Sequence, residues 1–159
     1  MEFLLAQSPV RTLAVAESVT CGRIQARIGE LSGASRFFLG GITTYTLQEK
    51  VRHLGVDRAA ARRVDCVSAQ VAAEMAAGVC RLFGSEVGAG VTGYAEPLEE
   101  HGVAEPHAWW ALAIRRGGRV RQVAGGRIEC PGAARLMAQQ MIADGVLAEL
   151  ATYLRAARA

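Results

Sequence analysis

In the first third of the chain, continuous apolar runs alternate with a segment whose apolar residues recur at helical spacing. Residues 13–16 form a continuous apolar run that stops at Glu17 and Ser18, which is typical of a short buried strand. Apolar residues then recur at helical spacing and predict a helix that Gly33 ends. Its apolar positions are Ile24, Ile28 and Leu31. Residues 37–45 are rich in aromatic and β-branched side chains, which predicts a second strand.

Capping signals mark the next two helices. Thr46 and Glu49 form a capping box, which predicts a helix that begins there and ends at Gly55. Ser68 is the expected N-cap of a longer helix that ends at Gly84.

The second half of the pattern predicts more strand than helix. Residues 87–91 read as a buried strand and residues 93–106 as a loop. Strands at 109–114 and 120–128 predict a hairpin, and a last helix is expected from Pro131 to about residue 153. Early alternation of strand and helix followed by a hairpin indicates a three-layer α/β/α sandwich with a mixed central sheet. We expect residues 1–159 to form a single domain.

Composition narrows the class of protein. The chain is 51% hydrophobic and 21% charged, with a net charge of +3, which is the balance of a globular protein. No apolar stretch approaches the ~20 residues that span a bilayer, and residues 1–6 make a poor signal peptide. The four cysteines and three histidines lack zinc-binding spacing. We therefore expect a cytoplasmic protein with reduced thiols, no metal and no membrane partner.

Lys50 is the single lysine among 18 cationic Lys and Arg residues. An arginine stays protonated in any protein setting, whereas a poorly solvated lysine can lose its proton and act as a base. Lys50 lies in the first helical turn after the strand at 37–45, a position that faces a strand-end crevice in α/β folds. A solvated surface charge is the alternative interpretation.

Ser18 is the candidate nucleophile. It lies between a predicted strand and a helix N-terminus, whose free N–H groups favour an oxyanion. Lys50 could take its proton, which would make a Ser–Lys pair suited to acyl transfer, with Tyr45 orienting the substrate. Simple helix capping by Ser18 or Thr20 is the alternative, and Cys21 is a rival nucleophile because a helix N-terminus lowers a thiol pKa.

Residues 88–93 formally match the pattern G-x-G-x-x-G. A dinucleotide site needs a helix after this motif, and here an acidic loop follows. We interpret the glycines as sites of close backbone packing, and we expect Thr92 and Gly93 at the strand end to contact a ligand.

In combination, these motifs resemble the CinA C-terminal domain family, the nicotinamide mononucleotide deamidases. The matching residues are Ala16-Glu17-Ser18-x-Thr20-x-Gly22, Phe38-Leu39-Gly40-Gly41-x-x-x-Tyr45, Lys50-Val51, Leu54-Gly55-Val56, Val67-Ser68 and Val91-Thr92-Gly93-x-Ala95-x-Pro97. The resemblance implies a single α/β/α domain that hydrolyses the amide of nicotinamide mononucleotide, without a cofactor or metal, in pyridine nucleotide recycling.

The resemblance also implies residue roles. Ser18 matches the nucleophile and Lys50 the base, with N–H groups near Thr20 to Gly22 holding the oxyanion. The implied substrate-binding residues are Thr20, Gly22, Tyr45, Thr92, Gly93 and Arg127, of which Arg127 matches the end of a late Gly-Asp-Arg pattern.

Two departures from the family pattern favour an alternative function. Cys21 and Glu96 stand where the family usually has glycine, and a carboxylate near a substrate phosphate would repel it. The alternative is a paralogue without deamidase activity that binds another small ligand or a protein partner.

Two further partners were weighed. The arginines around Gly117-Gly118 are explained by an exposed hairpin tip as well as by nucleic-acid binding, which we do not favour. Strand alternation sends one indole of Trp109-Trp110 outward, and an exposed indole often marks an interface, so we expect a homo-oligomer.

Overall fold

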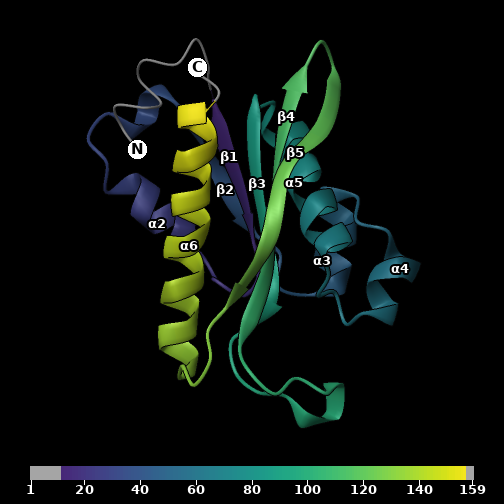
Figure 1. Cartoon of the computed structure of the whole chain (residues 1–159). Helices are drawn as coiled ribbons and strands as arrows, with labels where there is room; N and C mark the ends of the chain where they lie inside the picture. Colours follow the sequence, from purple (N-terminus) through teal and green to yellow (C-terminus); the bar gives the residue numbers. More distant parts are fainter. Residues whose placement is uncertain (1–11, 157–159) are drawn as a thin grey trace.

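A mixed sheet of five strands forms the centre of the molecule (Figure 1). The structure is a computed structural model and describes residues 12–156. The strand order is β2-β1-β3-β4-β5; β1 pairs in parallel with β2 and β3, and β4 pairs antiparallel with β3 and β5. The strands are β1 (Leu13–Glu17), β2 (Phe38–Thr43), β3 (Val87–Tyr94), β4 (His107–Arg116) and β5 (Arg119–Glu129).

Helices cover both faces of this sheet, with α2 and α6 on one face and α3, α4 and α5 on the other (Figure 1). Their bounds are α2 (Arg23–Gly29), α3 (Leu47–Leu54), α4 (Arg58–Arg63), α5 (Ala69–Phe83) and α6 (Arg135–Ala156), with short 3₁₀ turns η1 (Ala34–Arg36) and η2 (Glu99–His101). The predicted α/β/α sandwich is confirmed. Within residues 12–156, none of the helices has the length and apolar character to cross a membrane.

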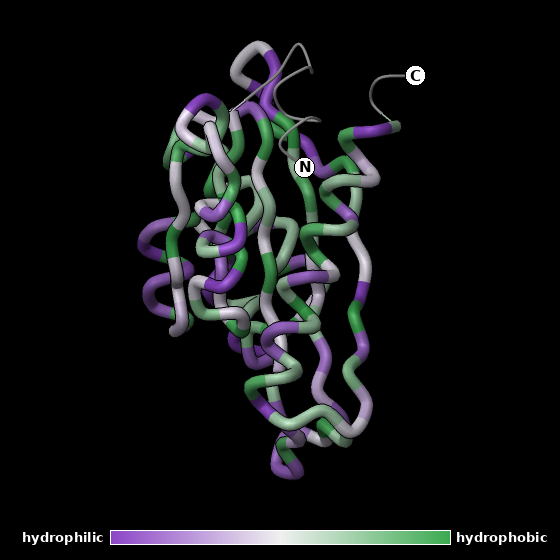
Figure 2. The backbone as a smooth tube through the Cα atoms, turned by 90° about the vertical axis from the view of Figure 1, so that its left-hand side faces the viewer, coloured by the Kyte–Doolittle hydropathy of each residue, from purple (hydrophilic) through white to green (hydrophobic). Residues whose placement is uncertain are grey.

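The central strand β1 separates two apolar cores. Leu13 and Val15 pack in the core beneath α2 and α6, while Ala14 and Ala16 pack beneath α3 and α5. All four side chains are at most 1% exposed, as a continuous apolar run predicts for a strand covered on both faces. Figure 2 shows the helices alternating between hydrophilic and hydrophobic residues, as helices with one buried face do.

The helix α5 packs unusually close to β3. A Cβ atom on Gly88 would lie 2.3 Å from the carbonyl oxygen of Ala76, and one on Gly90 would lie 2.4 Å from that of Ala72. Neither distance is compatible with a side chain, so these glycines let the helix backbone rest against the strand. The packing interpretation of residues 88–93 is thereby supported.

The predicted helix caps are confirmed. The Thr46 hydroxyl accepts from the Glu49 N–H and the Ser68 hydroxyl from the Val71 N–H. Gly55 and Gly84 end the two helices in the left-handed conformation.

Several boundaries differ from the sequence predictions; among them, α2 ends at Gly29 instead of at Gly33. The short helix α4 was not expected; the Asp57 carboxylate caps it by accepting from the Ala60 N–H at 2.8 Å. The last helix begins at Arg135 instead of Pro131, because Gly132 adopts a φ of 68° and residues 130–133 form a turn. Strand β3 also continues to Tyr94, into the predicted loop.

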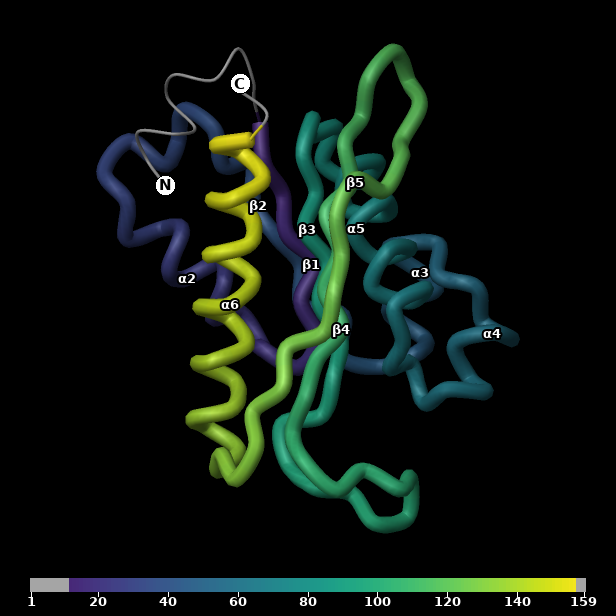
Figure 3. The backbone as a smooth tube through the Cα atoms, viewed as in Figure 1, coloured from purple at the N-terminus to yellow at the C-terminus, as the bar shows by residue number. Residues whose placement is uncertain are grey.

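The topology brings three strand ends together. Because β1, β2 and β3 are parallel, their carboxyl ends meet at one edge of the sheet; the chain runs from β1 to β2 on one side and then crosses to β3 on the other side of β1. The arginine-bearing tip of the β4–β5 hairpin lies at the opposite end (Figure 3). Ser18, Tyr45 and the residues after Tyr94 therefore share one edge.

Candidate active site

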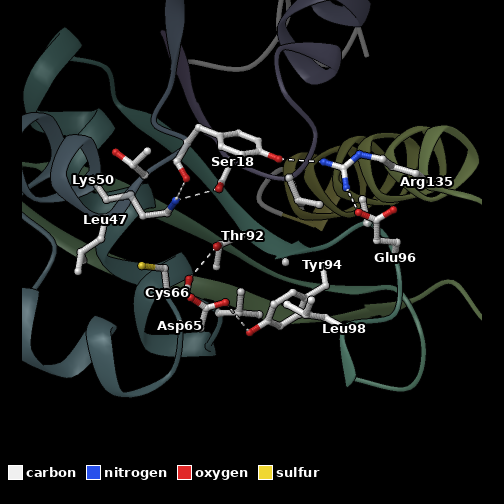
Figure 4. A pocket seen from close by; sticks show the side chains of 16 residues that line it. Ser18, Leu47, Lys50, Asp65, Cys66, Thr92, Tyr94, Glu96, Leu98 and Arg135 are labelled. Carbon is white, nitrogen blue, oxygen red and sulfur yellow. Dashed lines mark hydrogen bonds and ion pairs between the residues drawn. The ribbon is translucent and has the colours of Figure 1, made fainter. Parts of the chain in front are cut away.

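A cavity of about 340 Å³ opens at this edge (Figure 4). Sites for small molecules typically occupy about 300–1,000 Å³. Its walls come from the segments that follow β1, β2 and β3, from the segment before α5, and from the start of α6. Its chemically important side chains include Ser18, Tyr45, Lys50, Thr92, Glu96 and Arg135. We refer to it as the strand-end cavity.

Ser18 and Lys50 meet inside the strand-end cavity. The Lys50 Nζ atom lies 2.8 Å from the Ser18 Oγ atom. Lys50 is 1% exposed and Ser18 7% exposed, so bulk water does not surround the pair. The surface-charge interpretation of Lys50 is therefore wrong, and the contact required by a Ser–Lys pair is present.

Burial makes the neutral form of Lys50 easier to reach than in an ordinary lysine. Burial lowers the pKa of Lys50 from 10.5 to about 8, with the neighbouring Cys66 and Asp65 opposing that change. The Nζ atom also donates to the carbonyl oxygens of Thr44 at 2.8 Å and Tyr45 at 3.2 Å. A carbonyl oxygen can only accept, so these two contacts use both N–H groups of a neutral amine. The lone pair is then left for the Ser18 hydroxyl.

The helix N-terminus beside Ser18 is already capped by Glu17. This fully buried carboxylate accepts from the N–H groups of Gly22 at 3.0 Å, Ile24 at 3.2 Å and Gln25 at 2.9 Å. The Thr20 hydroxyl donates to the same carboxylate at 2.6 Å. Thr20 and Gly22 are outside the cavity lining, so the structure does not support their predicted contact with substrate. The Glu17 carboxylate therefore accepts the hydrogen bonds of the helix N–H groups that the sequence analysis expected to be free for an oxyanion.

Tyr45, Thr92 and Gly93 all line the strand-end cavity. The Tyr45 hydroxyl accepts a hydrogen bond from Arg135 at 2.9 Å, and the ring is 54% exposed. The Thr92 hydroxyl donates to the carbonyl oxygen of Cys66 at 2.7 Å, which ties β3 to the segment before α5. A Cβ atom on Gly93 would lie 2.3 Å from the carbonyl oxygen of His107, so the packing of β3 against β4 explains this glycine.

Arg127 and Cys21 lie outside the cavity lining. The Arg127 side chain pairs with Glu129 at 2.9 Å, and its guanidinium lies 5.7 Å from the ring centre of Trp109. The structure therefore does not bring Arg127 to the strand-end cavity, and its contact with substrate stays a prediction. The thiol of Cys21 is exposed at a backbone φ of 48°, so it does not narrow this cavity.

The two indoles lie on opposite faces of the sheet, but neither is exposed, so the expectation of an outward-facing exposed indole is wrong. Trp109 packs beside α5 and Trp110 lies in the core on the opposite face. Trp109 is only half-buried, and the homo-oligomer remains a prediction.

Sequence reasoning missed the part of the wall formed by Asp65 and Cys66. Both residues have positive φ, at 47° and 62°, which is uncommon for residues other than glycine. The Asp65 carboxylate accepts from the Tyr94 hydroxyl at 3.1 Å, and burial raises the pKa of Tyr94 to about 12. The only hint in the sequence was that Asp65 and Cys66 lie three and two residues before the predicted cap at Ser68.

Residues 12–156 contain no cluster of three or more His, Cys, Asp or Glu side chains that could hold a metal ion. The side chains at the cavity can supply a hydroxyl nucleophile, an amine base and one guanidinium. Such a set suits attack on a carbonyl carbon. Fold and cavity together define an α/β/α protein with a buried Ser–Lys pair at a strand-end site.

The chain belongs to the family described as the CinA C-terminal domain, whose model matches residues 3–153. A protein from Desulforamulus reducens that is named for competence-damage inducibility is 47% identical over 91 residues. That match covers 57% of this chain and 22% of the relative. A protein of the same name from Streptococcus equi subsp. zooepidemicus is 38% identical over 128 residues, covering 75% of this chain and 30% of the relative.

Solved structures agree with this assignment. The competence damage-inducible protein A of Klebsiella pneumoniae superposes with a TM-score of 0.84 at 25% identity, covering 96% of this chain and 91% of that one. A CinA superfamily protein of Enterobacter cloacae gives 0.83 at 27% identity, covering 95% and 86%. The chain thus spans nearly all of these structures but less than a third of the two longer relatives described above.

Proposed function

We propose that the protein hydrolyses the carboxamide of nicotinamide mononucleotide to nicotinic acid mononucleotide and ammonia. The observation that carries this proposal is the buried contact of 2.8 Å between Lys50 Nζ and Ser18 Oγ. Membership of the CinA C-terminal domain family supports it, since the family resemblance implies a deamidase with these two residues as base and nucleophile.

Neutral Lys50 accepts the proton of the Ser18 hydroxyl as Oγ attacks the carboxamide carbon. The C–N bond then breaks, Lys50 returns the proton to the leaving nitrogen, and ammonia departs from an ester on Ser18. A water molecule attacks this ester, giving its proton to Lys50, and the acid is released as the Ser18 hydroxyl forms again. The overall change is amide plus water to carboxylic acid plus ammonia.

The oxyanion of each tetrahedral intermediate needs N–H donors. Because Glu17 uses the N–H of Gly22, the donors must come from earlier in the turn. The N–H groups of Val19 and Thr20 make no hydrogen bond to another residue within 12–156, and they directly follow the nucleophile. We assign the oxyanion to the Val19 N–H, because Val19 lines the strand-end cavity whereas Thr20 does not.

Ammonia release from nicotinamide mononucleotide is the first test, with Ser18→Ala and Lys50→Met as paired variants. We expect the intact protein to release ammonia and both variants to lose at least about 10³-fold in kcat/KM. Far-UV circular dichroism checks that each variant folds. Folded variants that keep full activity would refute the Ser–Lys mechanism, and no release by the intact protein would favour the paralogue that binds another ligand.

A further inference from the structure

Arg135 and Glu96 lie on the side of the strand-end cavity opposite Lys50 (Figure 4), where Arg135 also contacts the Tyr45 hydroxyl. Arg135, from the first turn of α6, forms an ion pair with Glu96 and donates to the Tyr45 hydroxyl at 2.9 Å. Glu96 follows β3 and Tyr45 follows β2, so the contacts join three separate elements. About half of the Arg135 and Glu96 side chains is exposed, at 48% and 56%.

Arg135 is the only arginine among the described residues that line this cavity. A guanidinium with a fork of N–H donors is the group that best holds a phosphate. Here that group already has a carboxylate partner from the same wall. A substrate phosphate would therefore compete with Glu96 for Arg135 and would lie close to the Glu96 carboxylate.

The net charge of the cavity lining also disfavours a substrate phosphate. Its ionisable groups are Lys50, Asp65, Glu96 and Arg135, besides the Cys66 thiol, whose pKa burial raises, and the phenols. When Lys50 is neutral, as catalysis requires, two carboxylates face one guanidinium and the lining carries an excess of one negative charge. Such a surface attracts a pyridinium cation and repels a phosphate dianion.

We infer that Glu96 is a specificity-determining residue that favours N-ribosyl pyridinium carboxamides without a 5′-phosphate over the mononucleotide. This inference rests on the proposed function, because it names the preferred substrate of the same site. The riboside is a cation, whereas the mononucleotide carries an additional phosphate dianion at the 5′ position of its ribose. Since the Glu96–Arg135 pair is half exposed, water screens it, and we expect a preference of about 10-fold.

The experiment compares kcat/KM for nicotinamide riboside and nicotinamide mononucleotide in the intact protein and in Glu96→Gln. We expect the intact protein to prefer the riboside, and Glu96→Gln to shift the ratio toward the mononucleotide by about 10-fold. Glu99→Gln is the matched control, because Glu99 is an exposed acid of the same loop outside the cavity lining. Removing its charge should change the ratio less than about twofold.

The inference would be overturned if the intact protein preferred the mononucleotide. It would also be overturned if the ratio of kcat/KM for the two substrates were the same in Glu96→Gln as in the intact protein. Calorimetric titration of Ser18→Ala with each ligand separates this outcome from failure of the proposed function. If neither compound is hydrolysed but the riboside binds about 10-fold more tightly, the deamidase proposal fails and the role of Glu96 stands. If neither compound binds, both fail.

Discussion

Replacing Lys50 by methionine should change how the stability of the protein depends on pH. The lysine is buried, and its pKa falls from 10.5 in the unfolded chain to about 8 in the folded protein. Between these two values the unfolded chain binds more protons than the folded one, so the free energy of unfolding rises with pH in this window. Below pH 8 the folded protein bears the full cost of the buried charge.

The size of the effect follows from the two pKa values. Their difference of about 2.5, at 1.36 kcal/mol for each pKa unit, corresponds to a total of about 3 kcal/mol. Because the unfolded lysine is still mostly protonated at pH 10, about 2–3 kcal/mol of this appears between pH 7 and pH 10. A methionine of similar length carries no charge and removes this dependence.

Urea unfolding followed by tryptophan fluorescence measures the change at pH 7, 8, 9 and 10 in the intact protein and in Lys50→Met. The difference between the two proteins cancels the titrating groups that are not coupled to Lys50, among them Tyr94. The intact protein should gain about 2–3 kcal/mol relative to Lys50→Met over this range. Parallel pH profiles would refute the argument that burial lowers the pKa of Lys50.

Further predictions follow from the same contacts. Ammonia release should rise about tenfold per pH unit below pH 8 and level off above it, because only neutral Lys50 is a base. A flat pH profile would count against this role of Lys50. The variant Lys50→Arg should be inactive at every pH, because a guanidinium stays protonated. Glu17→Ala should lower the free energy of unfolding by about 3–5 kcal/mol in urea titrations, since it leaves several buried donors unpaired; a loss below about 1 kcal/mol would mean that water replaces the carboxylate. Gly93→Ala should cost about 1–3 kcal/mol in the same assay through its clash with His107, while the control Gly29→Ala, which meets no atom within 4 Å, should be neutral or slightly stabilising.

Local signals in the sequence predicted most of the architecture. The apolar run at residues 13–16 reads as a fully covered strand because no polar side chain interrupts it, and β1 is completely buried. Caps such as Thr46 and Ser68 act over three residues, so their partners are visible in the sequence itself. Pro131 misled because a proline suits a turn as well as a helix start, and Gly132 decides for the turn.

The sequence predicted only those parts of the site that lie at the carboxyl ends of neighbouring parallel strands. Ser18 and Lys50 both follow parallel strands, so their proximity follows from topology. The inward rotation of the Glu17 carboxylate depends on side-chain packing that no periodicity encodes. The pairing of Arg135 with Glu96 spans 39 residues, a distance over which the sequence pattern carries no signal about contact.

The glycine-mediated contact between α5 and β3 gives the strand-end cavity one rigid wall and one adaptable wall. Gly88 and Gly90 leave no space for the helix to slide on the strand, so the segment that leads into Ser68 has a fixed position. The opposite wall consists of long, half-exposed side chains at Glu96 and Arg135, which can change rotamer without disturbing the core. Substitutions that seek a new substrate range should therefore start at positions 96 and 135, where diversity costs little stability.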